Sequence, residues 1–326
     1  MDKIKTFLVE KNDNKLRLDK YLTYKLKNLT RTQIKKIILS RNVLVNDKVI
    51  FSPSQKIKSS DLIKLSIIEN RNEYIKPQKI KINIVYEDKD IIIVNKPSGM
   101  VVHPGAGNKD GTLVNGLLYF YKKNLSNLND ASRPGIVHRI DKETSGLLVV
   151  AKSNYAHANL SKQFSSHNIK RKYVALIWGV LRPLQGKIVT FLSRSKKNRQ
   201  LMSVNEISGK KAITNYKTLK VFNNKEIPKI SLVECSLETG RTHQIRVHLS
   251  HKGNGLIGDK KYGKQKLKFR KINKNFEKIL LNFKRQALHA KSLGFIHPVK
   301  NTEMNFDSKL PSDFKKMLDF LDKFCD

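Results

Sequence analysis

An aspartate between two cations is the first candidate for chemistry in this sequence. Asp141 ends the apolar-rich run that starts at Gly135 and precedes a turn, with Arg139 two positions before it and Lys142 directly after it. A buried carboxylate beside cations stays ionised at neutral pH, which suits a nucleophile or a base better than a general acid. In the alternative interpretation, Asp141 caps the turn and pairs with an arginine for structural reasons. The spacing of these residues leaves both interpretations open.

Familiar motifs for other kinds of chemistry are incomplete or missing. Gly105 and Gly107 lack the third glycine of a dinucleotide-binding loop, and no Gly-Lys-Ser/Thr sequence follows them. His243, His248 and His251 form no His-Glu-x-x-His motif and have no cysteine partner, which argues against zinc. The Gly-x-Ser-x-Gly motif of serine hydrolases is absent. We therefore expect neither a nucleotide cofactor nor a metal.

Strand patterns surround Asp141 and must hold it in place. The sequence predicts strands at 84–86, 91–94, 147–151, 173–178, 214–221 and 230–237, and helices from Ser153 to about Phe164 and over 242–249. The first two strands flank a short turn and predict a hairpin, and the third follows the Asp141 turn. Strands often follow strands without a long helix between them, so we predict an α+β fold with a mostly antiparallel sheet.

Positive charge is the dominant feature of the composition. The 326 residues include 65 Lys and Arg against 27 Asp and Glu, which gives a net charge of +38. Such a surplus favours a polyanionic partner, either a nucleic acid or an anionic membrane. Lysine supplies 51 of the basic residues, as an A/T-rich coding sequence would also produce. The basic residues are clustered, however, and clustering favours a nucleic acid.

Nothing in the sequence predicts a secreted or membrane protein. The apolar runs are far shorter than the ~18 residues that a membrane-spanning helix needs, and residues 1–15 lack the apolar segment of a secretory signal. Cys235 and Cys325 are the only cysteines, too few for a disulfide framework or a four-cysteine zinc site. We therefore expect a cytoplasmic protein that does not bind membranes. The length and the 39% hydrophobic content predict about two domains.

Residues 16–65 form a basic segment with 12 basic and 3 acidic side chains. Apolar residues recur at helical spacing from Leu18 to Leu29, and a capping-box pattern at Thr30 opens a second helix that ends near Ser40. Short strand patterns follow. On pattern alone, this segment fits a small helical domain with an ordinary solvated face as well as it fits an RNA-binding one.

Three pieces of this segment resemble an S4 domain, a small module whose helix pair binds structured RNA. They are Arg17–Leu22 (RLDKYL), Thr30–Ile38 (TRTQIKKII) and Arg41–Asp47 (RNVLVND). The resemblance implies an S4-like α/β RNA-binding domain over 16–68, in which Arg17, Arg31 and Lys35 are candidates for RNA binding. Arg31 and Lys35 are four residues apart and therefore share one helix face.

A polar segment over 69–80 is the predicted linker to a second domain over 81–326. Within this second domain, residues 260–285 hold 11 basic residues and one acid. Phenylalanines interleave with these charges at a seven-residue spacing, at Phe269, Phe276 and Phe283. We expect an amphipathic helix whose aromatic stripe packs on the core and whose charged face is free to contact phosphates.

Four segments of the second domain resemble the RluA family of pseudouridine synthases. They are His138–Lys152 (HRIDKETSGLLVVAK), Arg171–Leu176 (RKYVAL), Leu237–Leu249 (LETGRTHQIRVHL) and Arg285–Ala290 (RQALHA). Ile140 stands where the family more often has leucine, which is a conservative difference. The resemblance implies a mixed-sheet catalytic domain, mostly antiparallel, behind the S4-like domain. It also implies isomerisation of uridine in RNA to pseudouridine without a cofactor or a metal.

The resemblance further implies roles for individual residues. Asp141 matches the family's catalytic aspartate, which either attacks C1′ of the ribose or takes the 2′ proton. Tyr173 matches a tyrosine that stacks on the target base and helps to remove its C5 proton, and Arg246 matches an arginine that pairs with the aspartate. Arg139 matches a residue that enters the space left by the extruded nucleotide. Arg241, in the same motif as Arg246, is a further candidate for RNA binding.

Two segments indicate the class of RNA. Val101–Thr112 (VVHPGAGNKDGT) and Arg285–Ala290 are most similar to family members that act on large-subunit (23S) ribosomal RNA. The expected partner is therefore this RNA or a pre-ribosomal particle that contains it, and the expected oligomeric state is a monomer. One alternative is a sister synthase that modifies other ribosomal RNA sites or transfer RNA. Another is a non-catalytic S4-type RNA-binding or ribosome-assembly protein.

Overall fold

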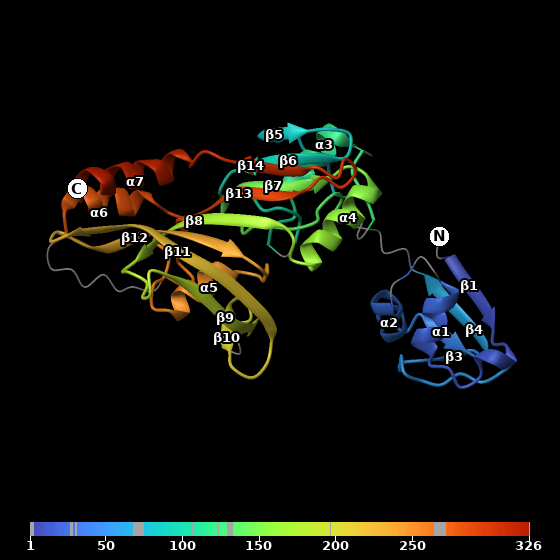
Figure 1. Cartoon of the computed structure of the whole chain (residues 1–326). Helices are drawn as coiled ribbons and strands as arrows, with labels where there is room; N and C mark the ends of the chain where they lie inside the picture. Colours follow the sequence, from blue (N-terminus) through green and yellow to red (C-terminus); the bar gives the residue numbers. More distant parts are fainter. Residues whose placement is uncertain are drawn as a thin grey trace. The chain divides into compact units, whose positions relative to one another are not determined.

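The computed structural model contains two compact units, Met1–Tyr74 and Ile75–Asp326 (Figure 1). Each unit has its own hydrophobic core. The structure describes residues 3–26, 29, 31–67, 75–105, 107–122, 124–128, 133–195, 197–263 and 272–325. Among these residues, no helix is both long enough and apolar enough to cross a lipid bilayer.

The N-terminal unit packs two helices on a four-stranded antiparallel sheet of order β1-β4-β2-β3. Its elements are β1 (Lys3–Leu8), the 3₁₀ helix η1 (Lys11–Asp13), α1 (Leu18–Lys25), α2 (Arg31–Leu39), β2 (Val43–Val45), β3 (Lys48–Val49) and β4 (Leu62–Ile67). Leu22 of α1, Ile34 of α2 and Ile63 of β4 are fully buried in one core. The predicted cap residue Thr30 lies outside the described residues.

Strand β1 begins before residue 16, where the sequence predicts the domain to start. It pairs along its whole length with β4, from Lys3 opposite Ile67 to Leu8 opposite Leu62. The side chains of Ile4 and Leu8 are exposed, so no buried apolar alternation marks this strand in the sequence. Backbone pairing with a strand more than fifty residues away defines β1.

The second unit is built around one mixed sheet that has ten strands among the described residues. The strands are β5 (Ile84–Glu87), β6 (Ile91–Lys96), β7 (Ser145–Ala151), β8 (Lys170–Trp178), β9 (Gln185–Arg194), β10 (Met202–Asn205), β11 (Lys210–Asn224), β12 (Ile227–Leu237), β13 (Leu288–Ile296) and β14 (Glu303–Asp307). They lie in the order β10-β9-β11-β12-β8-β13-β7-β6-β5, and β14 pairs with β13. Neighbours are antiparallel except β13 and β7, which are parallel. The predicted α+β class with a mostly antiparallel sheet is confirmed.

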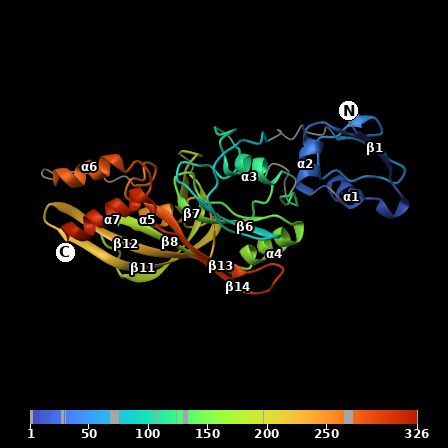
Figure 2. The ribbon, with the colours of Figure 1, turned by 90° about the horizontal axis from the view of Figure 1, so that it is seen from above.

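Helices cover both faces of this sheet. They are α3 (Leu113–Tyr121), α4 (Asn154–Ser165), α5 (Gln244–His251), α6 (Lys274–Asn282) and α7 (Ser312–Phe324). Side chains alternate between the faces along β8, so Tyr173 packs with α3 and α5, whereas Val174 packs with α6 and α7. Figure 2 shows α6 and α7 close together beside β11 and β12. Tyr173 therefore shares a face of the sheet with α5, the helix that carries Arg246.

Several of the predicted elements are present. β5 and β6 form the predicted hairpin, and the hydroxyl of Ser153 caps α4, which ends close to the predicted Phe164. Phe276 and Phe283 are buried in the core with α7, as predicted. The helix that carries Phe276 begins only at Lys274, and Phe269 lies outside the described residues.

Candidate active site

The turn that carries Asp141 is anchored by the start of β7. The backbone N–H of Thr144 donates to the carbonyl oxygen of Asp141 over 3.1 Å. Gly146 follows with a φ of +114°, and a Cβ at this position would collide with the backbone of Ala290 on β13. The parallel contact between β7 and β13 therefore requires glycine, and it fixes the strand that directly follows the turn.

A buried lysine holds the other side of the same turn. Nζ of Lys96 donates to the carbonyl oxygens of Pro97 and Met100, at 2.7 Å each, and of Lys142, at 3.0 Å. Burial lowers the pKa of Lys96 to about 7. The three carbonyl groups replace the water that this side chain loses on burial. They also tie the residue after Asp141 to the loop that follows β6.

Arg246 on α5 joins Asp141 to a second carboxylate. Its Nη1 donates to Oδ2 of Asp141 over 2.9 Å, while Nε and Nη2 donate to Asp259 over 2.7 and 2.9 Å. The side chain of Arg246 is 6% exposed and that of Asp259 is 1% exposed. Oδ1 of Asp259 also accepts the backbone N–H groups of Lys261 and Tyr262, at 2.9 and 3.1 Å. Asp259 thus fixes the guanidinium in the plane that reaches Asp141.

The attraction between Arg246 and Asp259 keeps both of these buried side chains charged. Burial alone would lower the pKa of Arg246, but the hydrogen bonds and charges of Asp259 and Asp141 raise it above its ordinary value. Burial alone would likewise raise the pKa of Asp259, and the hydrogen bonds and charge of Arg246 lower it overall. The hydrogen bond from Nη1 also brings the guanidinium cation of Arg246 against one oxygen of the Asp141 carboxylate.

Two cavities meet at Asp141. The first has a volume of about 530 Å³ and the second about 480 Å³. The residues that line both are Arg139, Ile140, Asp141, His243 and Arg246. The first cavity also has aromatic walls, from Phe164 and Tyr173, and the second is bordered by four exposed lysines, Lys142, Lys260, Lys261 and Lys284. The carboxylate therefore lies between an aromatic pocket and a basic one.

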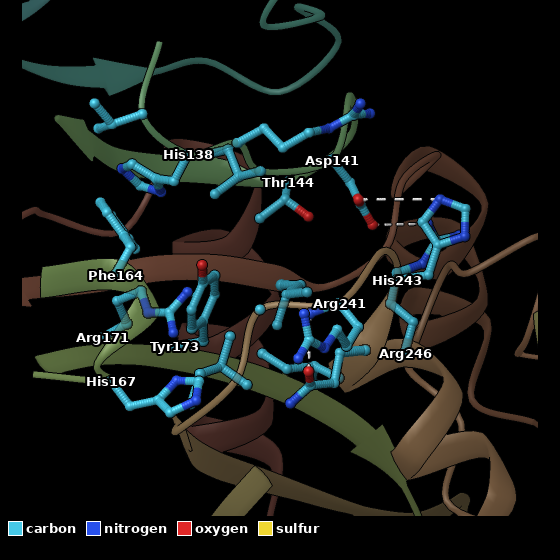
Figure 3. A pocket seen from close by; sticks show the side chains of 18 of the residues that line it. His138, Asp141, Thr144, Phe164, His167, Arg171, Tyr173, Arg241, His243 and Arg246 are labelled. Atoms are coloured by element: carbon cyan, nitrogen blue, oxygen red, sulfur yellow. Dashed lines mark hydrogen bonds and ion pairs between the residues drawn. The ribbon is translucent and has the colours of Figure 1, made fainter. Parts of the chain in front are cut away.

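Tyr173 lines the first cavity from β8. Figure 3 shows the carboxylate of Asp141 facing His243 and Arg246, with the ring of Tyr173 in the same pocket. The side chain is largely buried, and burial raises the pKa of Tyr173, while the charge of Arg171 opposes this shift. The ring therefore offers a neutral aromatic wall at physiological pH.

Arg139 and Arg241 both lie at the cavities. Arg139 is exposed and borders both of them, with Nη1 3.3 Å from Nε2 of His103. Arg241 borders the first cavity, and its Nε donates to the carbonyl oxygen of Lys211 over 3.1 Å. The structure thus brings Asp141, Tyr173, Arg246, Arg139 and Arg241 to one site.

The remaining candidates lie in the N-terminal unit. Arg17 and Arg31 both donate to the carboxylate of Asp19, at 2.9 to 3.2 Å. Asp19 is fully buried, and the two guanidinium groups are partly exposed. Lys35 is exposed on α2. Arg17 and Arg31 therefore neutralise a buried carboxylate and still present part of their surface to solvent.

Three further residues of the site were not predicted from the sequence. Asp259 binds Arg246, and the ring of Tyr262 lies 4.9 Å from the Arg246 guanidinium carbon, within the range of a cation–π contact. His243 places Nε2 4.0 Å from Oδ1 of Asp141. One signal is visible in hindsight: Asp259 is an acid at the edge of the lysine-rich stretch, between Gly258 and Gly263.

One of the three histidines considered for zinc in the sequence makes other contacts. His248 lies between the hydroxyls of Thr190 and Thr214, 2.9 Å from each. In the described part of the chain, no three His, Cys, Asp or Glu side chains are grouped closely enough to hold a metal ion.

Comparison with known proteins identifies the families that this chain is similar to. Residues 90–251 match the RNA pseudouridylate synthase family, and residues 16–63 match the S4 domain family. The chain is 45% identical over 313 residues to the ribosomal large subunit pseudouridine synthase D of Zymomonas mobilis, covering 94% of this chain and 93% of that protein. It is 38% identical over 316 residues to the enzyme of the same name in Escherichia coli, covering 97% and 94%.

A solved structure agrees with the sequence relatives. The human protein RNA pseudouridylate synthase domain containing 4 superimposes with a TM-score of 0.55 at 26% identity, covering 74% of this chain and 93% of that chain. The similarity extends through the segments that carry Asp141, Tyr173 and Arg246, which all lie within the matched range 90–251. The chain therefore belongs to the RNA pseudouridine synthase family and carries an S4 domain at its N-terminal end.

Proposed function

We propose that this protein converts specific uridines of large-subunit (23S) ribosomal RNA to pseudouridine, with Asp141 acting on the ribose of a flipped-out nucleotide. The observation that carries the proposal is the hydrogen bond from Arg246 to Asp141 at the boundary between the aromatic and the basic cavity. The relatives at 38–45% identity that are named for large-subunit RNA support the choice of substrate.

The reaction is an isomerisation, so its atoms balance within the nucleotide. The N1–C1′ bond breaks, the uracil turns, and a C5–C1′ bond forms. The proton on C5 is then lost, and N1 gains a proton. No oxidant, reductant or phosphate donor is consumed. A carboxylate can start this sequence by attacking C1′ or by taking the 2′ proton, and Asp141 is suited to either step because Arg246 orients its carboxylate through Oδ2 and leaves Oδ1 facing the cavities.

The two cavities suit different parts of the nucleotide. The aromatic cavity fits the detached uracil, since the ring of Tyr173 provides a flat wall on which the base can stack while it turns. The basic cavity fits the phosphates, which Lys260, Lys261 and Lys284 can neutralise. Arg139 borders both cavities, and this position supports its proposed role of filling the gap that the extruded nucleotide leaves.

Extruding a nucleotide costs a few kcal/mol in lost stacking and pairing. Phosphate contacts from the lysines of the basic cavity and from Lys35 of the S4 unit can offset this cost. A net charge of +38 supplies a long-range attraction to the RNA as well. We infer that the protein works as a monomer in the cytoplasm on this RNA or on a pre-ribosomal particle.

A map of pseudouridines in a deletion strain tests the proposal. Ribosomal and transfer RNA from wild-type and deletion cells are treated with carbodiimide and read by primer extension. We expect the deletion to remove specific signals from large-subunit RNA, and a plasmid copy of the wild-type gene to restore them. Loss of signals only from transfer RNA would favour the sister synthase. No loss at all would favour a non-catalytic RNA-binding role.

A further inference from the structure

Tyr262 and His243 form a hydrogen-bonded pair beside Asp141. Nδ1 of His243 lies 2.8 Å from Oη of Tyr262, and Oη also accepts the backbone N–H of Met202 over 2.8 Å. Within the residues that the structure describes, the phenolic proton has no hydrogen-bond acceptor other than Nδ1 of His243. We therefore assign Tyr262 as the donor and Nδ1 as the acceptor, the arrangement in which the phenolic proton is satisfied.

This hydrogen bond fixes the tautomer of His243. Burial lowers the pKa of His243, and the nearby positive charges of Arg246 and Lys261 act in the same direction, while Asp141 and Asp259 oppose them. A neutral imidazole that accepts at Nδ1 carries its proton on Nε2. That nitrogen lies 4.0 Å from Oδ1 of Asp141, so an N–H donor and a carboxylate oxygen face the same space.

The backbone holds the imidazole in this position. His243 has a φ of 56° and a ψ of 20°, in the left-handed region that residues with a side chain seldom adopt. Its ring packs edge-on against Tyr262, with centroids 5.5 Å apart, and its side chain is 15% exposed at both cavities. Arg246 donates to Oδ2 of Asp141, and Oδ1 accepts no hydrogen bond from any described residue. The pair of atoms is thus open to substrate.

An oxygen that binds both atoms must accept one hydrogen bond and donate another. Two hydrogen bonds of about 2.8 Å that meet at an angle on one oxygen can span the gap of 4.0 Å. The carbonyl oxygens of uracil only accept, and phosphate oxygens only accept and are repelled by Asp141. A hydroxyl does both. Within an RNA chain the 3′ and 5′ oxygens of the ribose are esterified, which leaves the 2′-hydroxyl, attached next to C1′.

We propose that His243 is a further active-site residue whose Nε2–H donates to the 2′-hydroxyl of the target uridine, while this hydroxyl donates to Asp141. The inference rests on the proposed function, since it requires the ribose to lie at Asp141. The contact distinguishes ribose from deoxyribose and holds C1′ beside the carboxylate. Tyr262 is the positioning residue that keeps the proton on Nε2.

Binding of product RNA tests the contact without turnover. Two RNAs of identical sequence carry either pseudouridine or 2′-deoxypseudouridine at the target position, and their Kd values are measured by fluorescence anisotropy with the full-length protein. We expect the wild type to prefer the ribose form by about tenfold, the size of one hydrogen bond. His243→Ala is expected to bind both forms about equally. His243→Gln, which keeps an N–H donor, is expected to regain part of the preference.

Two further variants complete the test. Tyr262→Phe removes the donor to Nδ1, so we expect its preference for ribose to fall as well. His251→Ala, at the exposed last residue of α5, is the control and is expected to keep the wild-type preference. The melting curve of His243→Ala shows whether this variant folds. If it does not fold, the inference is judged from the preference for ribose over deoxyribose that His243→Gln and Tyr262→Phe retain.

The inference is overturned if His243→Ala prefers the ribose RNA as strongly as the wild type does. It is also overturned if the wild type binds the ribose and the deoxyribose RNA with the same Kd. Pseudouridine formation by Asp141→Asn is measured alongside. An active Asp141→Asn variant contradicts the proposed function itself, whatever the binding ratios are. The two failures are therefore distinguishable.

Discussion

Nη1 of Arg246 lies 2.9 Å from Oδ2 of Asp141, although the two residues are 105 positions apart in the chain. The other hydrogen bonds of the guanidinium go to Asp259, so only one oxygen of Asp141 is engaged. Asp259 holds the guanidinium of Arg246 through these two hydrogen bonds. This division of hydrogen bonds fixes the orientation of Asp141 and leaves its second oxygen facing the cavities.

Arg246→Ala is expected to slow pseudouridine formation by about a hundredfold or more, because the charge that stabilises Asp141 is lost. It is also expected to lower the free energy of unfolding by about 3–5 kcal/mol, because Asp259 is left as an unpaired buried charge. Single-turnover rates and urea denaturation measure the two effects. Arg246→Lys is the matched control, since it keeps a charge but cannot bridge both carboxylates. A near-normal rate for Arg246→Ala would rule out the assigned role.

Tyr173→Phe keeps the aromatic wall and removes only the hydroxyl. We expect it to release the C5 proton about tenfold more slowly at unchanged RNA affinity, because the resemblance to the RluA family implies that the hydroxyl helps to remove this proton. Tyr173→Leu also removes the wall and is expected to be slower still. Release of tritium from uridine labelled at C5 measures both rates. A wild-type rate in the phenylalanine variant contradicts a role for the hydroxyl. A wild-type rate in the leucine variant contradicts the role of the aromatic ring as a wall for the base.

Two buried histidines predict how stability depends on pH. Burial lowers the pKa values of His248 and His289 to about 4. The unfolded chain takes up protons on these residues below about pH 6.5, whereas the folded chain does not until about pH 4. Stability should therefore fall as the pH falls between these values, by at most about 1.4 kcal/mol per pH unit for each histidine.

Urea denaturation at pH 7 and pH 5 measures this effect. His248→Gln is expected to reduce the difference between the two pH values, because glutamine does not titrate. His251→Gln changes an exposed histidine and serves as the control, with the wild-type difference expected. An unchanged difference in His248→Gln would show that this histidine is not the source of the pH dependence.

Arg31 and Lys35 lie four residues apart on α2 but are expected to respond differently to substitution. Arg31→Ala leaves the buried Asp19 with Arg17 as its remaining arginine, and we expect the N-terminal unit to lose about 1.5–3 kcal/mol of stability. Lys35→Ala is expected to leave stability unchanged and to weaken RNA binding, with a smaller dependence of Kd on salt. Thermal unfolding and binding at several salt concentrations measure these effects. A stable Arg31→Ala variant, or unchanged binding by Lys35→Ala, contradicts the respective role.

Much of the fold follows from local sequence patterns, and the missed elements lack such patterns. The predicted hairpin and the strand after Asp141 are short, strongly apolar runs bounded by turns. β9 was missed because apolar residues lie on both of its faces: Ile188 and Leu192 are buried, whereas Val189 and Phe191 are exposed. No alternation of apolar and polar residues marks such a strand.

The sequence predicts only those site residues that lie in recognisable motifs. Asp141 and Arg246 lie in motifs that resemble a known family, so the sequence alone identifies both as candidates. The partners Asp259 and Tyr262 come from a loop that only the fold brings beside α5. His243 appeared in the sequence as one of three histidines, and its spacing says nothing of the left-handed backbone that turns it toward Asp141.

The most direct test of the account is the Asp141→Asn variant in a single-turnover assay on a large-subunit ribosomal RNA transcript. Asparagine keeps the size and the oxygen acceptor for Arg246 but cannot attack C1′ or take a proton. Pseudouridine is detected by carbodiimide primer extension, and the Kd for the transcript is measured on the same preparation. We predict no pseudouridine above background, with a Kd close to that of the wild type. Pseudouridine at the wild-type level, or loss of RNA affinity in parallel with loss of activity, contradicts the central role given to this carboxylate.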